Sequence, residues 1–65
     1  MRKNEFRRSI VSKRKLNEGE ILKESDLDSK RPGTGISPSE IKYIIGRKLK
    51  KDVEEDELIS WDDLL

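Results

Sequence analysis

Hydrophobic residues are sparse along this chain and fall into short groups separated by charged stretches. Residues 9–12 place two β-branched side chains, Ile10 and Val11, between serines, which predicts a short strand. Ile41, Ile44 and Ile45 follow the i, i+3, i+4 spacing of one helical face and predict a helix of about two turns. The pattern therefore predicts a small fold of short strands and short helical turns.

Capping residues support this helix. Ser37 is suited to the N-cap, Pro38 to the first helical position and Glu40 to the third, where its carboxylate can reach back to the cap. Gly46 comes directly after the last apolar residue and is suited to the position beyond the C-cap, where positive φ is common. The sequence thus predicts both ends of the helix.

The strongest feature of the pattern is a duplication. Residues 13–27 recur 37 positions later as residues 50–64, with five identical pairs and four more that are alike in kind. The identical pairs are Lys13/Lys50, Glu18/Glu55, Glu20/Glu57, Asp26/Asp63 and Leu27/Leu64. Two such copies predict a pseudo-two-fold arrangement in which each half covers the apolar side of the other. The predicted centre is the pairing of residues 21–22 with residues 58–59.

Each copy contains a tight turn and a one-turn helix. Gly19 takes positive φ at little steric cost, and Asp56, at the same place in the second copy, is among the few other residues that tolerate it. Ser60 is the predicted N-cap of the second one-turn helix, with Asp63 at its third position. Lys23 holds the cap position in the first copy and is a poorer choice. The leucine after each helix is predicted to point inward.

The turn between the copies carries the candidate functional residue. Arg31 is followed by Pro32, Gly33, Thr34 and Gly35, and the proline and glycines stiffen the turn so that it presents a guanidinium at a fixed place. The five donors of this group would orient an anionic or polar ligand. The alternative is that Arg31 pairs with a surface carboxylate, an interaction of about 0–1 kcal/mol. The residues themselves leave both interpretations open.

Length and composition bound the other possibilities. The 65 residues form one domain, with residues 1–8 as a flexible N-terminus or linker and residues 9–65 as the folded part. The chain has no cysteine and no histidine, so neither a disulfide nor a Cys/His metal site is expected. No apolar run approaches the roughly 18 residues of a membrane span. We expect a cytoplasmic chain with no catalytic machinery of its own.

Charge is distributed unevenly although the net charge is only +1. Residues 1–15 carry seven Lys and Arg against one Glu, and residues 52–65 carry seven Asp and Glu and no base. The basic segment suggests a binding module for nucleic acid or an acidic partner, but only Phe6 is interleaved there to stack on a base. The acidic segment fits a solvated face better than a cation site. Phe6, Tyr43 and Trp61 are predicted to be partly packed in the core.

Several motifs occur in the order found in one protein family. They are Phe6-Arg7-Arg8-Ser9-Ile10-Val11, Leu16-Asn17-Glu18-Gly19-Glu20-Ile21-Leu22, Asp26-Leu27, Lys30-Arg31-Pro32-Gly33-Thr34-Gly35-Ile36 and Ile45-Gly46-Arg47. Over residues 6–64 the chain resembles the C-terminal antifreeze-like (SAF) domain of sialic acid synthases. The Arg-Pro-Gly-x-Gly element after an x-Glu-Gly-Glu turn is the most specific part of the resemblance.

The resemblance implies a small, mostly β and irregular domain, a pretzel-like β-clip with an internal pseudo-dyad and short helical turns. In the parent enzymes an N-terminal (β/α)8 barrel condenses phosphoenolpyruvate with an N-acylated hexosamine such as N-acetylmannosamine. These enzymes are domain-swapped dimers in which the SAF domain caps the active site of the other subunit. By motif match Arg31, on its loop of Pro32, Gly33, Thr34 and Gly35, is the residue that contacts the sugar near its N-acyl group.

The same resemblance places the cofactor outside this chain. A divalent metal, Mn or Mg, and the phosphoenolpyruvate ligands belong to the barrel, so no metal-binding or catalytic residue is expected here. The implied partners are the barrel, the second subunit and the sugar substrate, with no membrane. Neuraminic, legionaminic and pseudaminic acid synthases would look alike in this domain, so the particular sugar acid is not specified.

The fold implied by the resemblance is also that of fish type III antifreeze proteins. Their ice face is flat and carries small residues, whereas residues 13–23 here are crowded with Lys, Arg and Glu. Long hydrated side chains do not present a flat surface. Ice binding is therefore not expected.

Overall fold

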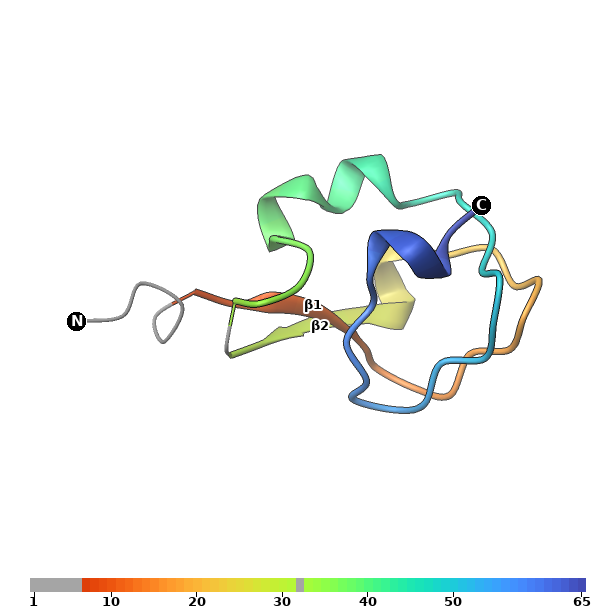
Figure 1. The fold of residues 1–65 in the computed structure, drawn as a ribbon, viewed down its shortest axis with the longest axis horizontal. Coiled ribbons are helices and arrows are strands. Elements are labelled where there is room, and N and C mark those ends of the chain that lie inside the picture. The colour runs from red at the N-terminus through yellow and green to blue at the C-terminus, as the bar shows by residue number, and fades with distance from the viewer. Residues whose placement is uncertain (1–6, 32) are drawn as a thin grey trace.

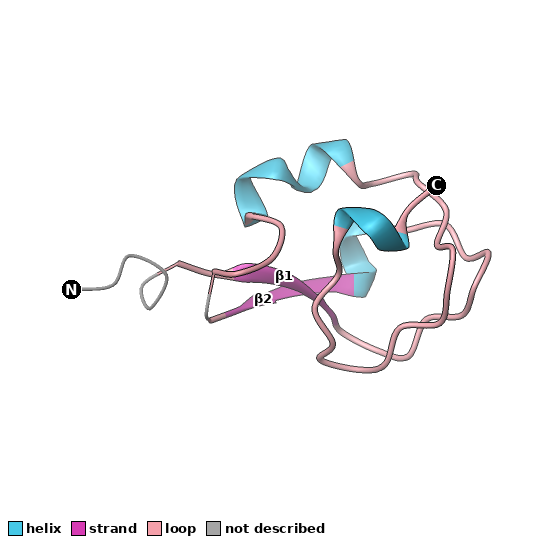
Figure 2. Cartoon of the chain, viewed as in Figure 1, coloured by secondary structure: helices cyan, strands magenta, loops and turns pink. Residues whose placement is uncertain are grey.

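The computed structural model describes residues 7–31 and 33–65. Its elements are β1 (Ser9–Ser12), η2 (Glu24–Asp26), β2 (Leu27–Lys30), η3 (Pro38–Tyr43) and η4 (Trp61–Asp63), where η marks a 3-10 helix. In Figure 1 the two strands lie side by side, η3 runs above them, and long loops gather to the right. Most of the chain outside these elements is loop and turn (Figure 2). The predicted small fold of short strands and helical turns is confirmed.

β1 and β2 pair in antiparallel fashion, from Ser9 opposite Lys30 to Ser12 opposite Leu27. The strand predicted at residues 9–12 is therefore confirmed, and all four of its residues are buried. β1 also bridges a second segment through Val11. Because β1 has neighbours on both edges, it lies inside the fold.

The centre of the pseudo-two-fold arrangement is the pair Leu16 and Val53. Each donates its backbone N–H to the carbonyl of the other, both at 2.8 Å, and both side chains are fully buried. The predicted centre, residues 21–22 against residues 58–59, is wrong, because the first residue of each segment points outward and is 52% and 40% exposed, respectively. The second residue of each segment is buried and contributes to the core.

Other contacts between segments obey the same two-fold relation. Two bridges in one half have a counterpart in the other half that is displaced by 37 positions in both members. The related bridges are Val11 to Leu58 with Lys48 to Ile21, and Ser12 to Leu27 with Leu49 to Leu64. Backbone hydrogen bonds follow the rule too: Lys13 donates to the Asp26 carbonyl at 2.8 Å, and Lys50 to the Asp63 carbonyl at 2.7 Å. The sequence repeat is therefore a structural repeat.

The tight turns of the two copies are built alike. Gly19 has φ +89° and Asp56 has φ +66°, as the sequence predicts for these positions. In each turn a glutamate carboxylate accepts the backbone N–H three residues earlier, at 2.7 Å for Glu20 and 2.8 Å for Glu57. The residue with positive φ then joins each turn to a distant segment, because Gly19 donates to the Leu49 carbonyl at 2.9 Å and Asp56 to the Ser12 carbonyl at 2.8 Å.

The one-turn helices η2 and η4 are also equivalent. The Asp26 carboxylate accepts the backbone N–H of Lys23 at 3.3 Å, and the Asp63 carboxylate accepts that of Ser60 at 3.0 Å. The leucine that follows each helix is buried, as predicted. Both helices are held by an aspartate at the third position, so the weaker cap residue Lys23 does not prevent the first one from forming.

The helix predicted from the isoleucine spacing is η3. The Ser37 hydroxyl accepts the N–H of the second helical residue at 3.3 Å, which confirms the N-cap. The helix is of the 3-10 type and is followed by a turn in which Gly46 has φ +88° and donates to the Leu22 carbonyl at 2.9 Å. Ile44 is fully buried while Ile45 is exposed, because η3 ends at Tyr43 and both isoleucines lie in the turn that follows, not on the predicted helical face.

The core consists of aliphatic side chains from both copies and from the segment between them. It contains Ile10, Leu16, Leu22, Leu27, Ile36, Ile44, Leu49, Val53, Ile59 and Leu64. The predicted core positions of Tyr43 and Trp61 are wrong, since these side chains are 60% and 45% exposed. The space between two short copies is filled by aliphatic residues and leaves no room for a ring. Phe6 lies outside the described residues.

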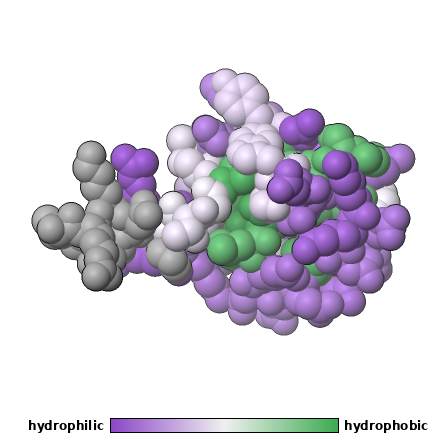
Figure 3. Space-filling model, in the orientation of Figure 1, coloured by the Kyte–Doolittle hydropathy of each residue, from purple (hydrophilic) through white to green (hydrophobic). Residues whose placement is uncertain are grey.

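Polar residues cover most of the visible surface, with smaller apolar areas between them (Figure 3). In the described part of the chain, no helix is long and apolar enough to cross a membrane. Most of the predicted N-terminal linker, residues 1–6, is outside the described part. The proposed boundary at residue 9 therefore stays a prediction.

Candidate functional site

The Arg31 turn begins where β2 ends. Lys30, the last residue of β2, faces Ser9 across the sheet, and its Nζ lies 2.7 Å from Oδ1 of Asp56. Arg31 follows directly and is exposed. Among the described residues it forms no ion pair, so the alternative of a surface salt bridge applies to Lys30 and not to Arg31. Pro32 lies outside the described residues.

The turn is fastened to β1 a second time on its far side. The backbone N–H of Gly35 donates to Ser9 Oγ at 2.8 Å, and the carbonyl of Ile36 accepts the N–H of Ile10 at 2.8 Å. Thr34, between the two fastened sides, is exposed. The chain therefore contacts β1 at Lys30, just before Arg31, and again at Gly35 and Ile36. These contacts restrict where the backbone of Arg31 can move.

Gly33 is required for a reason that the sequence does not reveal. A Cβ at this position would lie 2.3 Å from the Cβ of Arg7, closer than two such atoms can approach. A Cβ on Gly35 would lie 3.4 Å from that of Ser9, which is an ordinary van der Waals contact. The turn packs so closely on the residues before and within β1 that a side chain at position 33 does not fit.

A polar hollow of about 420 Å³ lies beside this turn. It is lined by Arg7 and Arg8, Gly33 and Gly35, and Ser37 and Ser39. The two arginines were not predicted to be site residues, because residues 1–8 were predicted to be a flexible terminus or linker. The sequence does place both of them directly before the strand predicted at residues 9–12, and this adjacency is the feature that could have identified them. We refer to this feature as the arginine hollow.

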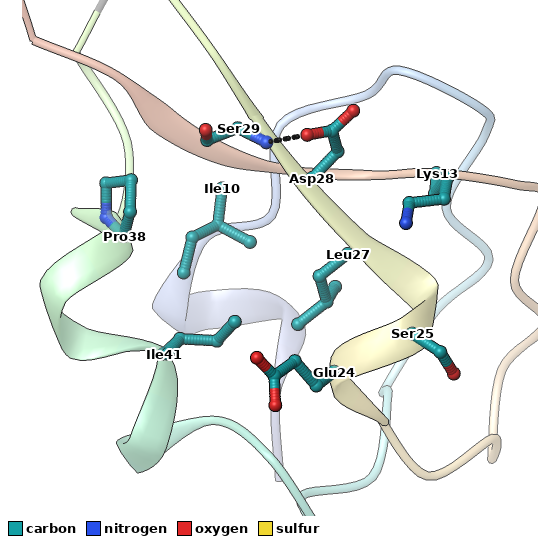
Figure 4. Close-up of a pocket in the computed structure, with 9 residues that line it drawn as sticks. All are labelled: Ile10, Lys13, Glu24, Ser25, Leu27, Asp28, Ser29, Pro38 and Ile41. Atoms are coloured by element: carbon teal, nitrogen blue, oxygen red, sulfur yellow. Dashed lines mark hydrogen bonds between the residues drawn. The ribbon is translucent and has the colours of Figure 1, made fainter.

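A second, larger hollow of about 590 Å³ lies between β2, η2 and η3 (Figure 4). Ile10, Leu27 and Ile41 point toward it from three different elements, and Pro38 borders both hollows. Asp28 at its edge accepts the backbone N–H of Ser29 at 2.8 Å and is thereby engaged within the strand. The surface beside the turn thus changes from cationic to apolar across Pro38.

A charged network braces the first copy. Arg14 Nε lies 3.1 Å from Asp26 Oδ1 and its Nη2 lies 3.1 Å from Glu20 Oε1. The hydrogen bonds to Glu20 and to Asp26 raise the pKa of the Arg14 guanidinium above its usual value. The pKa of Glu20 is lowered, first by the hydrogen bond from the backbone N–H of Asn17 and then by Arg14. This network supports the scaffold and contributes nothing to the Arg31 turn.

The second copy repeats the network with a lysine. Lys51 Nζ lies 3.5 Å from Glu57 Oε2 and 3.6 Å from Asp63 Oδ1. The charges of Asp63 and Glu57 raise the pKa of Lys51. Over residues 7–31 and 33–65, no group of three or more acidic side chains is arranged to hold a metal ion. The structure therefore offers Arg31 and the arginine hollow as its candidate site.

Two halves that bury each other's apolar residues, joined through a fastened turn, define the small antifreeze-like SAF fold. A profile of the SAF domain matches residues 7–65. This chain belongs to the SAF domain family.

Three comparisons refine this assignment. An uncharacterized protein of Methanocaldococcus jannaschii is 51% identical over 61 residues, covering 94% of this chain and 18% of that protein. The N,N'-diacetyllegionaminic acid synthase of Campylobacter jejuni is 41% identical over 56 residues, covering 86% of this chain and 17% of that protein. The solution structure of an antifreeze protein like domain in human N-acetylneuraminic acid phosphate synthase superposes with a TM-score of 0.83 at 34% identity, covering 88% of this chain and 73% of that one.

These relatives include sugar acid synthases and a domain of such a synthase. The chain spans no more than 18% of the length of the two curated relatives described. The resemblance to the antifreeze-like domain of these synthases is thereby confirmed.

Proposed function

We propose that this chain is the substrate-capping domain of a sialic-acid-type synthase, an enzyme that condenses phosphoenolpyruvate with an N-acylated hexosamine such as N-acetylmannosamine. Membership of the SAF family and the similarity to sugar acid synthases support the parent enzyme. The observation that carries the proposal is Arg31, which is exposed and without an ion-pair partner among the described residues, on a turn fastened to β1 from both sides.

Arg31 has the chemistry that this role requires. Its guanidinium donates in a planar fork and orients the carbonyl oxygen of an N-acyl group as well as attracting it. Because the backbone of the turn is already fastened at both ends, ordering the Arg31 side chain is the main entropic cost on this side when the sugar binds. A hydrogen bond from a charged donor contributes about 1.5–3 kcal/mol. Such a contact helps to position the hexosamine for attack without taking part in bond formation.

The remaining chemistry belongs to parts of the parent outside this chain. We assign the phosphoenolpyruvate ligands and the divalent metal, Mn or Mg, to the barrel domain. In the proposed domain-swapped dimer this chain covers the active site of the other subunit and contributes Arg31 to it. Residues 1–8 form the linker toward the barrel in this arrangement, and residues 9–65 form the domain.

The test is the variant Arg31→Ala in the parent synthase. We expect kcat/KM for the hexosamine to fall by about 10- to 100-fold, because one charge-assisted hydrogen bond is lost. KM for phosphoenolpyruvate should change little. Arg47→Ala is a matched control, since Arg47 is also exposed and outside the turn. Unchanged hexosamine kinetics in a correctly folded Arg31→Ala enzyme would refute the assigned role.

A further inference from the structure

The arginine hollow carries positive charge that the fold does not neutralise. Arg7 and Arg8 are among its lining residues, and no carboxylate is among the described residues that line it. Neither arginine forms an ion pair within the described part of the chain, whereas Lys30 and Arg14 both do. Unpaired cations that share one hollow attract an anion.

The strand register brings Arg31 to the same end of the sheet. Ser9 faces Lys30 in the last pair of the ladder, and Arg8 and Arg31 are the next residues along the chain beyond this pair. Arg8 Nη1 donates to the Ser29 carbonyl at 3.0 Å, which holds this guanidinium against β2. The arginine hollow therefore lies at the end of the sheet from which the Arg31 turn starts.

The duplication does not repeat these arginines. The positions 37 residues after Arg7 and Arg8 are Ile44, which is fully buried, and Ile45. Arg47 provides a second comparison, because its Nε donates to the Leu65 carbonyl at 3.0 Å in the way that Arg8 donates to Ser29. Arg47 lines neither hollow. The cationic pair is therefore a property of the Arg31 end of the molecule.

We propose that the arginine hollow binds an oxyanion, a carboxylate or a phosphate group, with Arg8 as its principal contact and Arg7 as its second. The planar fork of Arg8 matches two oxygens of such a group. Gly33 and Gly35 lack side chains and leave the hollow open. The hydroxyls of Ser37 and Ser39, 2.9 Å apart, supply neutral hydrogen-bonding groups beside the arginines.

Anion binding by the isolated chain does not depend on the proposed function, but its use in turnover rests on it. In the parent synthase the hollow would hold the carboxylate of the sugar acid product while Arg31 contacts the N-acyl group. A cap that recognises both groups discriminates between sugars by the spacing of these groups as well as by their chemistry.

The experiment titrates the 65-residue chain with sodium acetate and, separately, with sodium phosphate, while chloride keeps the ionic strength constant. Backbone amide and arginine side-chain NMR signals report binding. We expect saturable shifts around Arg8 in at least one titration, and the anion that saturates identifies the group. Arg8→Gln should weaken this binding by about tenfold, Arg8→Lys by less, and the matched control Arg47→Gln by no more than about twofold.

Stability separates a binding role from a structural one. Arg8 and Arg47 are both exposed and each donates one hydrogen bond to a backbone carbonyl, so Arg8→Gln should lower the midpoint of thermal unfolding by no more than Arg47→Gln does. Failure of both anions to saturate, or equal weakening by Arg8→Gln and Arg47→Gln, overturns the inference. If Arg31→Ala impairs the parent enzyme while Arg8→Gln binds both anions normally, the proposed function stands and this inference fails. If Arg8→Gln loses binding while Arg31→Ala has normal kinetics, the hollow is a site and the proposed function fails.

Discussion

The two copies of the fold provide an internal comparison, because the same backbone arrangement is built twice from different side chains. The first copy turns through Gly19 and the second through Asp56, both with positive φ. In the first copy, Arg14 lies 3.1 Å from a carboxylate oxygen of both Glu20 and Asp26. In the second copy, Lys51 lies 3.5 Å from Glu57 and 3.6 Å from Asp63. Backbone hydrogen bonds and buried leucines are common to both copies. The cation of the surface network differs, because it is an arginine in one copy and a lysine in the other.

The Arg31 turn and η3 have no counterpart among the described residues of either copy. The Arg31 turn and η3 connect the end of the first copy to the start of the second, and they are fastened to β1 by backbone and serine contacts. The core uses Ile36 and Ile44 from this segment as well as residues of both copies, so the segment is part of the packed domain. The exposed Arg31 lies on the part of it that leads out of the core.

The largest expected effect comes from breaking the centre that both copies share. Leu16→Ala removes a fully buried side chain at the two-fold axis and should lower the free energy of unfolding by about 2–5 kcal/mol. Leu58→Ala, at a half-exposed position of the second copy, is the matched control and should lower it by clearly less. Urea denaturation of both variants measures the difference. Equal losses would show that the two positions contribute alike and that Leu16 is not the centre.

The sequence predicted the duplication but not its centre, for a physical reason. Apolar spacing shows that residues 21–22 and 58–59 contain core residues, and it does not show which member of each pair points inward. The turns at Gly19 and Asp56 fix that choice, because they set the direction in which the chain returns. Ile21 is consequently outside and the next residue inside.

The candidate site was predictable in part. Arg31 stood out because a proline and two glycines follow it within four residues. The role of Gly33 was not predictable, since it depends on contact with Arg7, a residue 26 positions earlier. Arg7 and Arg8 were missed for the same reason: only the pairing of β1 with β2 brings them beside the turn. Local patterns identify turns and caps, whereas contacts between distant segments require the fold.

A smaller effect distinguishes the connecting turn from the turns of the copies. Gly33→Ala places a Cβ 2.3 Å from that of Arg7, so the turn or β1 must shift. We expect a loss of about 1–3 kcal/mol in the free energy of unfolding. Gly19→Ala is the comparison: it has open space around the added Cβ, and its loss of about 1 kcal/mol reports only the strain of positive φ. A Gly33→Ala variant as stable as the unaltered chain would show that the turn does not pack closely on Arg7.

The smallest effect concerns the charged networks and depends on pH. The pKa of Glu20 is lowered in the folded chain by the backbone N–H of Asn17 and by Arg14, so the folded state favours the ionised carboxylate. Its contribution to stability is therefore complete well above the ordinary glutamate pKa of about 4.3 and is lost as the pH falls through the lowered folded value. Glu20→Gln should reduce the dependence of the unfolding midpoint on pH in this acidic range. The midpoints of Glu20→Gln and the unaltered chain should become similar at the lowest pH, where the carboxyl group is protonated.

Arg14→Gln should reduce the same dependence on pH by a smaller amount, because the hydrogen bond from Asn17 is the larger cause of the lowered Glu20 pKa and remains in this variant. If Arg14→Gln removed more of the pH dependence than Glu20→Gln, the bracing of the first copy would depend on the arginine and not on the turn, and the two copies would differ in more than their surface charges.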